Sequence, residues 1–327
     1  MKTMENKVKV GVIGVGHMGR YHVGAYSEIT DVTLEGVVDL NKTLVNNVAE
    51  KYRTRSFTDY RDFLKYVDVV SISVPTKLHF EVTRECLLRG KHCLVEKPIC
   101  ENLAQAEELF ELAKQKGLVL HVGHVERFNG AVQELRKVVQ DPILIESRRL
   151  GPFDPRVAND SVVLDLMIHD IDIILNIVDS PVEHLNVLGT SVFSDKEDVV
   201  NVQIQFESGC LANIIASRAT QEKIRTLAVT QQSEYVVLNY TNQDILVHRR
   251  SSSQSELTRQ ELRYKQESLI ERIFVHKENP LKLQLKHLVA CAANGEKRLT
   301  SVGDELKSLK VALSVLDSLK TGRTAKV

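Results

Sequence analysis

The sequence is short of several features that would point to particular classes of protein. Lysine plus arginine and aspartate plus glutamate each total 43, so the formal net charge is zero, which argues against a general attraction to nucleic acid or to a membrane surface. There is no apolar run long enough to span a bilayer. The five cysteines form no C-x-x-C pair, so free thiols are expected rather than a disulfide framework.

The chain also lacks the marks of secretion and of metal binding. Its opening, Met-Lys-Thr-Met-Glu-Asn-Lys, has no apolar core of the kind found in a signal peptide, so a cytoplasmic location is expected. His121 and His124 lie three residues apart, but neither has a cysteine or acidic partner nearby at ligand spacing. No metal site, no internal repeat and no low-complexity tract is expected.

What the chain does contain is the ordinary balance of a globular protein, with 43% hydrophobic and 26% charged residues. Its 327 residues are enough for two domains. Through residue 123, β-branched runs alternate with helical segments, which predicts right-handed βαβ units and a parallel Rossmann sheet. From about residue 187, alternation of apolar and polar residues predicts antiparallel strands with one solvent-exposed face. The polar residues 249–263 are expected to form a loop or an edge strand.

A glycine-rich turn follows the first predicted strand, residues 8–13. Gly14, Gly16 and Gly19 fall in the order G-x-G-x-x-G. In such a turn the first glycine permits a tight bend, the second lets a diphosphate approach bare backbone, and the third lets the next helix pack closely. That helix begins near His17 and would direct its free N–H groups at the phosphates. The turn predicts dinucleotide binding, with a purely structural βα turn as the alternative.

An acidic residue ends the second predicted strand, residues 32–38. Asp39 lies about twenty residues past the glycines, where a carboxylate would hold the ribose hydroxyls of the adenosine. Its charge would repel a 2′-phosphate, which favours NAD over NADP. Lys42 is close enough in sequence to soften that preference.

Three predicted strand ends should meet at one edge of the sheet, because ligands of such sheets sit beyond the carboxyl ends of the strands. They carry residues 14–19, 75–79 and 96–98. Glu96-Lys97-Pro98 is the most informative, because a lysine directly after a buried strand and before a proline has little freedom. Exposed Glu-Lys pairs are common, so the tripeptide alone proves little. The position of Lys97 at the carboxyl end of a predicted Rossmann strand is what favours a lysine that acts on a hydroxyl as an acid, a base or an electrostatic partner.

In the second half, a helix predicted over residues 161–179 carries a second polar group. Asp165, His169 and Asp172 lie at i, i+4 and i+7 and would share one face. Polar side chains on a half-buried face need hydrogen-bond partners. A hydrogen-bonded core histidine is therefore the plain alternative to a functional one.

Taken together, these residues resemble the Gfo/Idh/MocA oxidoreductases. The resemblance implies an α/β protein with an NAD-binding Rossmann domain over residues 1–123. It also implies a substrate-binding and oligomerisation domain over residues 124–327, an α+β domain with a large, mostly antiparallel open sheet. The resemblance rests on residues 14–19 with Asp39, Val74-Pro75-Thr76 with His79, Glu96-Lys97-Pro98, residues 165–172 and 280–287, and the last helix.

The resemblance also implies roles for individual residues. The implied catalytic residues are Lys97, Asp165 and His169. The implied cofactor contacts are Gly14, Gly16, His17, Met18, Gly19, Asp39, Pro75, Thr76, His79, Glu96 and Lys97. The implied substrate contacts are Arg127, Asn129, Arg156, Asp165 and His169. Arg127, Arg148, Arg149 and Arg156 could contact a diphosphate, but surface or interdomain salt bridges are expected for at least two of the four.

The implied reaction is NAD-dependent oxidation of a secondary hydroxyl on a sugar ring. His169 would accept the hydroxyl proton, Lys97 would hydrogen-bond the same oxygen and Asp165 would orient the hydroxyl or pair with Lys97. The sequence leaves open an exchange of the base role between His169 and Lys97. Asp172 would orient His169.

Residues 124–129 and 165–172 are most similar to the branch that oxidises the 3-hydroxyl of UDP-N-acetylglucosamine, although Gly130 stands where proline is expected. The alternatives are a dehydrogenase of a free sugar or inositol-like polyol and a catalytically silent NAD-binding regulator. A homodimer or homotetramer through the second-domain sheet is expected, with no nucleic-acid or membrane partner.

Overall fold

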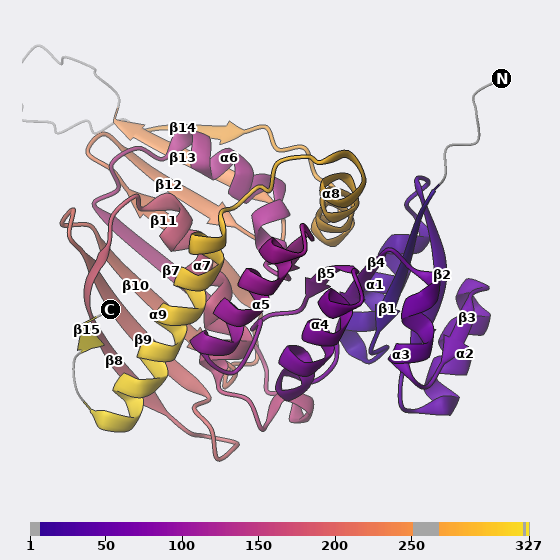
Figure 1. Cartoon of the computed structure of the whole chain (residues 1–327). Coiled ribbons are helices and arrows are strands. Elements are labelled where there is room, and N and C mark those ends of the chain that lie inside the picture. Colours follow the sequence, from indigo (N-terminus) through magenta and orange to yellow (C-terminus); the bar gives the residue numbers. More distant parts are fainter. Residues whose placement is uncertain (1–6, 251–267, 323–324, 327) are drawn as a thin grey trace, which may run out of the picture. The chain divides into compact units, whose positions relative to one another are not determined.

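The computed structural model describes residues 7–250, 268–322 and 325–326 (Figure 1). Most of the stretch 249–263, predicted as a loop or an edge strand, lies outside these residues. The chain forms two compact units. The first unit comprises Met1–Phe128 and Glu278–Lys310, and the second comprises Asn129–Lys277 and Val311–Val327.

Six parallel strands form the sheet of the first unit, in the order β3-β2-β1-β4-β5-β6. The strands are β1 (Val8–Ile13), β2 (Val32–Val38), β3 (Arg55–Phe57), β4 (Val69–Ile72), β5 (His92–Val95) and β6 (Leu120–Val122). The central strands β1, β4 and β5 are rich in β-branched or aliphatic residues and almost wholly buried, as expected for a parallel sheet covered on both faces. The strand order reverses between β1 and β4, which is where ligands bind in such sheets. The predicted Rossmann sheet is confirmed.

Helices connect these strands. They are α1 (His17–Ser27), α2 (Lys42–Tyr52), α3 (Tyr60–Phe63), α4 (His79–Leu88) and α5 (Leu103–Gln115), with short 3₁₀ turns η1 (Leu64–Tyr66), η2 (Thr76–Leu78) and η3 (Val125–Phe128). Asparagine side chains cap two of them: Asn41 accepts the Leu44 N–H and Asn102 accepts the Gln105 N–H. No described helix is both long and apolar enough to cross a bilayer.

The first unit is completed by a helix from the far end of the chain. Helix α8 (Pro280–Asn294) places Leu281, Leu285 and Leu288 in one buried cluster with Val10 and Val23. The predicted division at residue 123 had assigned this helix to the second domain. Its apolar side instead forms part of the core around α1, so the compact units follow packing rather than chain order. The boundary between units also falls inside α9 (Val302–Thr321).

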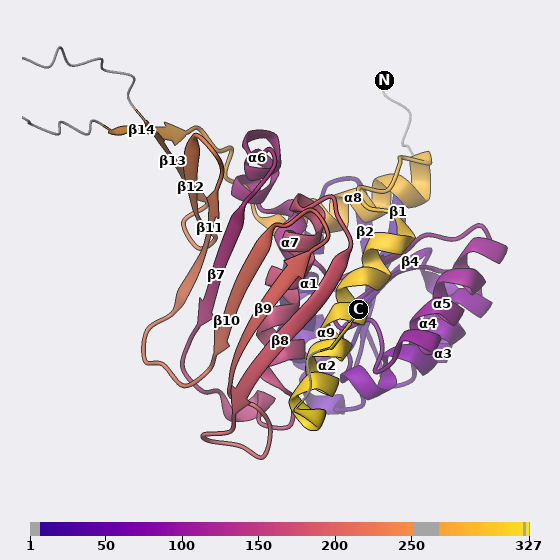
Figure 2. The same cartoon turned by 90° about the vertical axis from the view of Figure 1, so that its left-hand side faces the viewer.

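Nine strands form the sheet of the second unit, in the order β14-β13-β12-β11-β7-β10-β9-β8-β15 (Figure 2). Among the described strands of this sheet, only β7 and β10 pair in parallel, which confirms the mostly antiparallel sheet. The strands are β7 (Leu144–Leu150), β8 (Val182–Thr190), β9 (Val199–Phe206), β10 (Leu211–Ser217), β11 (Ile224–Thr230), β12 (Glu234–Asn239), β13 (Asp244–Arg250), β14 (Ser268–Ile273) and β15 (Ala325–Lys326).

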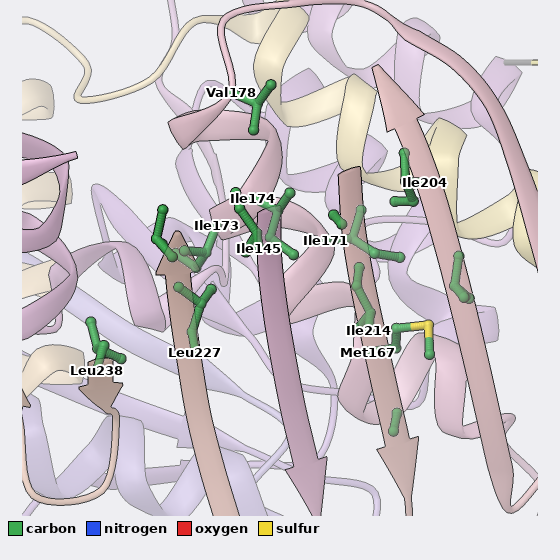
Figure 3. Close-up of a cluster of buried hydrophobic side chains, with 14 of the residues drawn as sticks. Ile145, Met167, Ile171, Ile173, Ile174, Val178, Ile204, Ile214, Leu227 and Leu238 are labelled. Atoms are coloured by element: carbon green, nitrogen blue, oxygen red, sulfur yellow. The ribbon is translucent and has the colours of Figure 1, made fainter. Parts of the chain in front are cut away.

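Helical segments cover one face of this sheet: α6 (Gly130–Val138), the one-turn π-helix η5 (Val163–Met167) and α7 (Ile168–Ile177). Figure 3 shows Ile171 and Ile174 of α7 reaching toward Ile145 of β7 and Ile214 of β10. All four side chains are buried, and burying each one is worth about 1.5–3 kcal/mol. This packing fixes α7 on the sheet.

Candidate functional site

The glycine turn of the first unit has the geometry that its spacing predicts. Gly14 has a φ of +86°, and a β-carbon there would lie 2.7 Å from the Ser73 carbonyl oxygen. A β-carbon on Gly19 would lie 1.8 Å from the Gly14 oxygen, which would prevent the close packing of α1. At Gly16 nothing lies within 4 Å of the β-carbon position. The turn therefore offers open backbone beside the exposed residues His17 and Met18, at the start of α1.

The carboxylate of Asp39 lies against this turn. One oxygen accepts the Val15 N–H at 2.9 Å, and the other accepts the Asn41 N–H at 2.9 Å. Each oxygen still has a lone pair for a further donor, because an ionised carboxylate offers about four acceptor sites. The half-buried side chain is thus held where it can accept hydrogen bonds from ribose hydroxyls.

The loop after β4 contains Pro75, which is exposed, and Thr76, which is half-buried. His79 is only 1% exposed, and its ring nitrogens lie 2.8 Å from the Pro98 oxygen and 2.9 Å from the Val74 oxygen. Burial lowers the pKa of His79 although both carbonyls oppose the shift. Both ring nitrogens already contact backbone oxygens, one in the loop after β4 and one in the loop after β5. His79 would therefore affect cofactor binding by positioning these two loops.

The end of β5 carries Glu96, Lys97 and Pro98, with the Lys97–Pro98 peptide in the cis form. Lys97 is half-buried, whereas Glu96 is buried and lies 2.8 Å from the Nε2 atom of His22 on α1. The sequence did not lead us to His22. It lies three residues after Gly19 and therefore on the same face of α1, and this spacing could have identified it.

Two expected substrate contacts already have protein partners. Arg127 is buried in η3, and its Nη1 lies 2.9 Å from an oxygen of Glu305. Asn129 is also buried; it caps α6 by accepting the Ala131 N–H and donates to the Tyr240 oxygen. Both side chains are therefore already held within the protein by these interactions.

Gly130 stands where proline was expected, and the structure gives two reasons for glycine. Its N–H donates to the side-chain oxygen of Gln243 at 3.3 Å, and proline has no N–H. A β-carbon at this position would lie 2.5 Å from the His276 carbonyl oxygen. The departure therefore reflects local packing in the second unit.

Asp165 and His169 lie on consecutive turns of one helical segment in the second unit, and both are half-buried. A regular helix had been predicted from residue 161, whereas the segment opens with the π-helical turn η5 and becomes α-helical at Ile168. The wider turn includes Asp165, so the expected i to i+4 geometry with His169 is altered. Turns of this kind occur frequently at functional sites. Asp172 is buried.

Arginines near this segment divide into buried and exposed. Arg149 on β7 is 1% exposed and Asp170 on α7 is 0% exposed; Nε lies 2.6 Å from Oδ2 and Nη2 lies 3.1 Å from Oδ1. Arg156 is exposed and paired with Asp154. Arg127, Arg149 and Arg156 each form a salt bridge. The bridges of Arg127 and Arg149 are buried within one unit, not at the surface or between domains as expected, and Arg156 is the member of these pairs that a solvent-borne anion can reach.

One cluster in the first unit brings together metal-ligand side chains that are far apart in sequence. His121, His287 and Cys291 have ligand atoms within 4.8 Å of one another. However, Arg127 and Arg298 line the same small cavity, which has room for about one water molecule. Burial and the Arg298 charge lower the pKa of His121 to about 3, and the Nε2 atom of His287 already accepts the Leu299 N–H. These surroundings do not fit a cation.

Comparisons with known proteins agree across both units. A family model described as "Oxidoreductase family, NAD-binding Rossmann fold" matches residues 8–124, and one described as "GFO/IDH/MocA C-terminal domain" matches residues 130–235. A UDP-N-acetylglucosamine 3-dehydrogenase from Acidithiobacillus ferrooxidans is 35% identical over 246 residues, covering 75% of this chain and 78% of that protein.

Two further similarities bear on fold and substrate. A solved structure of the Acidithiobacillus ferrooxidans enzyme aligns with a TM-score of 0.87 and 30% identity, covering 97% of this chain and 99% of that one. A myo-inositol 2-dehydrogenase from Thermotoga maritima is 27% identical over 230 residues, covering 64% of this chain and 69% of that protein.

Proposed function

The chain belongs to the Gfo/Idh/MocA family of NAD(P)-dependent oxidoreductases acting on sugar hydroxyls, and from that premise we propose that it oxidises the 3-hydroxyl of UDP-N-acetylglucosamine to a 3-keto nucleotide sugar. The observation that carries this substrate is the similarity to the Acidithiobacillus ferrooxidans enzyme, which bears that activity in its name and aligns over nearly the whole chain.

The proposed acceptor is NAD. The open backbone at Gly16 can receive a diphosphate, and the oxygens of Asp39 can accept hydrogen bonds from ribose hydroxyls. The same carboxylate disfavours a 2′-phosphate, which supports NAD over NADP. The chemistry that NAD supplies when bound is acceptance of a hydride from the carbon that carries the hydroxyl.

Three side chains of this protein would handle the hydroxyl proton. His169 takes the proton, because an imidazole titrates close to neutral pH. Lys97 donates a hydrogen bond to the same oxygen and stabilises the negative charge that develops there. Asp165 orients the hydroxyl. Two of the four arginines, Arg148 and Arg156, are exposed. Arg156 is the proposed diphosphate contact, whereas Arg127 and Asn129 are left out because they are buried.

A panel of alcohols tests the substrate. Purified protein with NAD is expected to generate NADH, followed by its absorbance, with UDP-N-acetylglucosamine but not with free N-acetylglucosamine or myo-inositol. The nucleotide would supply binding energy that the free sugar lacks. Turnover of myo-inositol alone would contradict the nucleotide-sugar proposal in favour of the polyol alternative. NAD binding with no turnover of any alcohol would favour the silent regulator.

A glycine substitution tests the cofactor position separately from the fold. Gly16→Val is expected to weaken NAD binding by at least about tenfold, or 1.4 kcal/mol, because the side chain would fill the backbone approach that a diphosphate uses. Its melting temperature should stay close to wild type, since nothing lies within 4 Å of the new β-carbon. The measurements are NAD titration by calorimetry and thermal unfolding.

Gly19→Ala is the matched control, because its β-carbon would meet the Gly14 oxygen at 1.8 Å. That variant is expected to lose stability. Undiminished NAD affinity in Gly16→Val would show that the dinucleotide binds elsewhere.

The sheet of the second unit is the proposed surface for self-association. Several of its strands, and the residue after β14, carry exposed apolar side chains: Leu188, Leu211, Tyr235, Leu269, Ile270 and Phe274. Neighbouring exposed apolar side chains are a common mark of protein–protein contact, and Leu269, Ile270 and Phe274 lie close together in sequence at the edge strand β14. We propose a homodimer or homotetramer formed through this sheet.

A further inference from the structure

A buried histidine and a buried glutamate lie directly behind the proposed lysine. His22 on α1 is 0% exposed and Glu96 is 7% exposed. The Nε2 atom of His22 is 2.8 Å from Oε1 of Glu96. The other oxygen, Oε2, accepts the backbone N–H of Lys97 at 3.3 Å. A single carboxylate therefore connects the helix that follows the glycine turn with the backbone of Lys97.

The hydrogen-bonding pattern indicates which group donates. The Nδ1 atom of His22 is buried and has no hydrogen-bond partner among the described residues. A neutral ring with its proton on Nε2 can donate to Glu96 and leaves only a lone pair unsatisfied. With Glu96 ionised, the proton of this contact lies on Nε2, so His22 donates and Glu96 accepts.

Glu96 has little room to leave this position. A β-carbon on Gly123, just after β6, would lie 2.9 Å from the Glu96 carboxyl carbon and from Oε2, so the carboxylate occupies the space that glycine leaves. Burial would raise the pKa of Glu96, but the hydrogen bond and charge of His22, together with the nearby charge and backbone N–H of Lys97, outweigh burial and hold the pKa below its usual range. The titratable groups that face the carboxylate are His22, Lys97 and His79 on α4.

We infer that His22 is a positioning residue for Lys97, acting through Glu96. By donating to the carboxylate, His22 keeps Glu96 charged and in place, and Glu96 in turn holds the Lys97 backbone and supplies a negative charge beside its amine. The inference rests on the proposed function of Lys97. In addition, the Glu96 carboxylate hydrogen-bonds both to α1, whose start is the proposed diphosphate site, and to the backbone of the lysine that acts on the hydroxyl.

The test is the pH dependence of turnover with UDP-N-acetylglucosamine. His22→Leu is expected to lower kcat by about 10- to 100-fold with a smaller change in KM for NAD. The loss should deepen as the pH falls from 8 toward about 6. Wild-type Glu96, with its lowered pKa, stays charged throughout this range. Without the donor, burial is less opposed, so the pKa of Glu96 rises and the charge is lost at the acid end.

Matched variants separate this role from simple packing. His22→Gln keeps an N–H donor near the Nε2 position and should recover most of the loss. Glu96→Gln cannot ionise and should show low turnover without the extra acid-side fall. If His22 acts through Glu96, the double variant His22→Leu/Glu96→Gln will be no slower than Glu96→Gln alone. Additive losses in the double variant, or a wild-type pH profile in His22→Leu, would overturn the inference.

A second measurement needs no substrate. The Glu96 carboxyl can be followed by ¹³C NMR, with Glu96→Gln providing the assignment, and its midpoint should rise in His22→Leu and return in His22→Gln. An unchanged midpoint would overturn the inference whatever the substrate is. Failure of the proposed function has a different signature, namely near-normal turnover in Lys97→Met. An inactive Lys97→Met beside a normal His22→Leu would remove only the role of His22.

Discussion

Replacing His169 by asparagine is expected to lower kcat by about 10²- to 10⁴-fold, the usual contribution of a general base. Asparagine is of similar size and can hydrogen-bond, but it cannot take the hydroxyl proton. The NAD dissociation constant should remain close to wild type, because His169 belongs to the second unit and the glycine turn belongs to the first. Steady-state turnover of UDP-N-acetylglucosamine and calorimetric NAD titration provide the two measurements.

His184→Asn is the matched control, because His184 is a half-buried histidine on β8 of the same unit and has no proposed role in the reaction. It should turn over at the wild-type rate. Turnover of His169→Asn within a few-fold of wild type would remove His169 as the base. The base role would then pass to Lys97, the exchange that the sequence left open.

Asp170→Asn is expected to lower the free energy of unfolding by about 3–5 kcal/mol, the typical cost of breaking a buried ion pair from one side. Asparagine would leave Arg149 buried and charged, since a guanidinium cannot give up its proton. The Tyr240 ring, centred 4.8 Å from the guanidinium carbon of Arg149, would compensate for only a small part of the loss. Urea denaturation of wild type and variant measures the difference.

Two control variants test whether the stability loss in Asp170→Asn depends on the burial of the ion pair. Asp154→Asn breaks the exposed pair with Arg156 and should cost no more than about 1 kcal/mol. The double variant Arg149→Met/Asp170→Leu removes both charges and should recover most of the stability lost in Asp170→Asn. A loss below about 1 kcal/mol for Asp170→Asn would mean that the pair contributes no more than an exposed one.

The parts of the site that could be predicted are those encoded over short stretches of chain. The bend at Gly14, the open backbone at Gly16 and the close approach at Gly19 follow from spacing alone, because each depends on a missing β-carbon. The position of Asp39 follows from the strand that precedes it. The parallel first sheet and the mostly antiparallel second sheet follow from periods that differ between the two halves.

The parts that could not be predicted depend on partners distant in sequence. Nothing local to Arg127 indicates that Glu305 neutralises it, and nothing near Glu96 indicates that His22 donates to it. The π-helical turn was missed for a different reason. Its residues suit an α-helix as well, and the wider turn is a property of the packed segment rather than of the residue pattern.

The return of α8 to the first unit has a consequence for biosynthesis. Leu281, Leu285 and Leu288 complete the apolar cluster around Val10 and Val23, yet the ribosome makes them only after strands β7 to β14 of the second sheet have been translated. A growing chain cannot close that cluster before then, so α1 gains its full packing support only after α8 has left the ribosome.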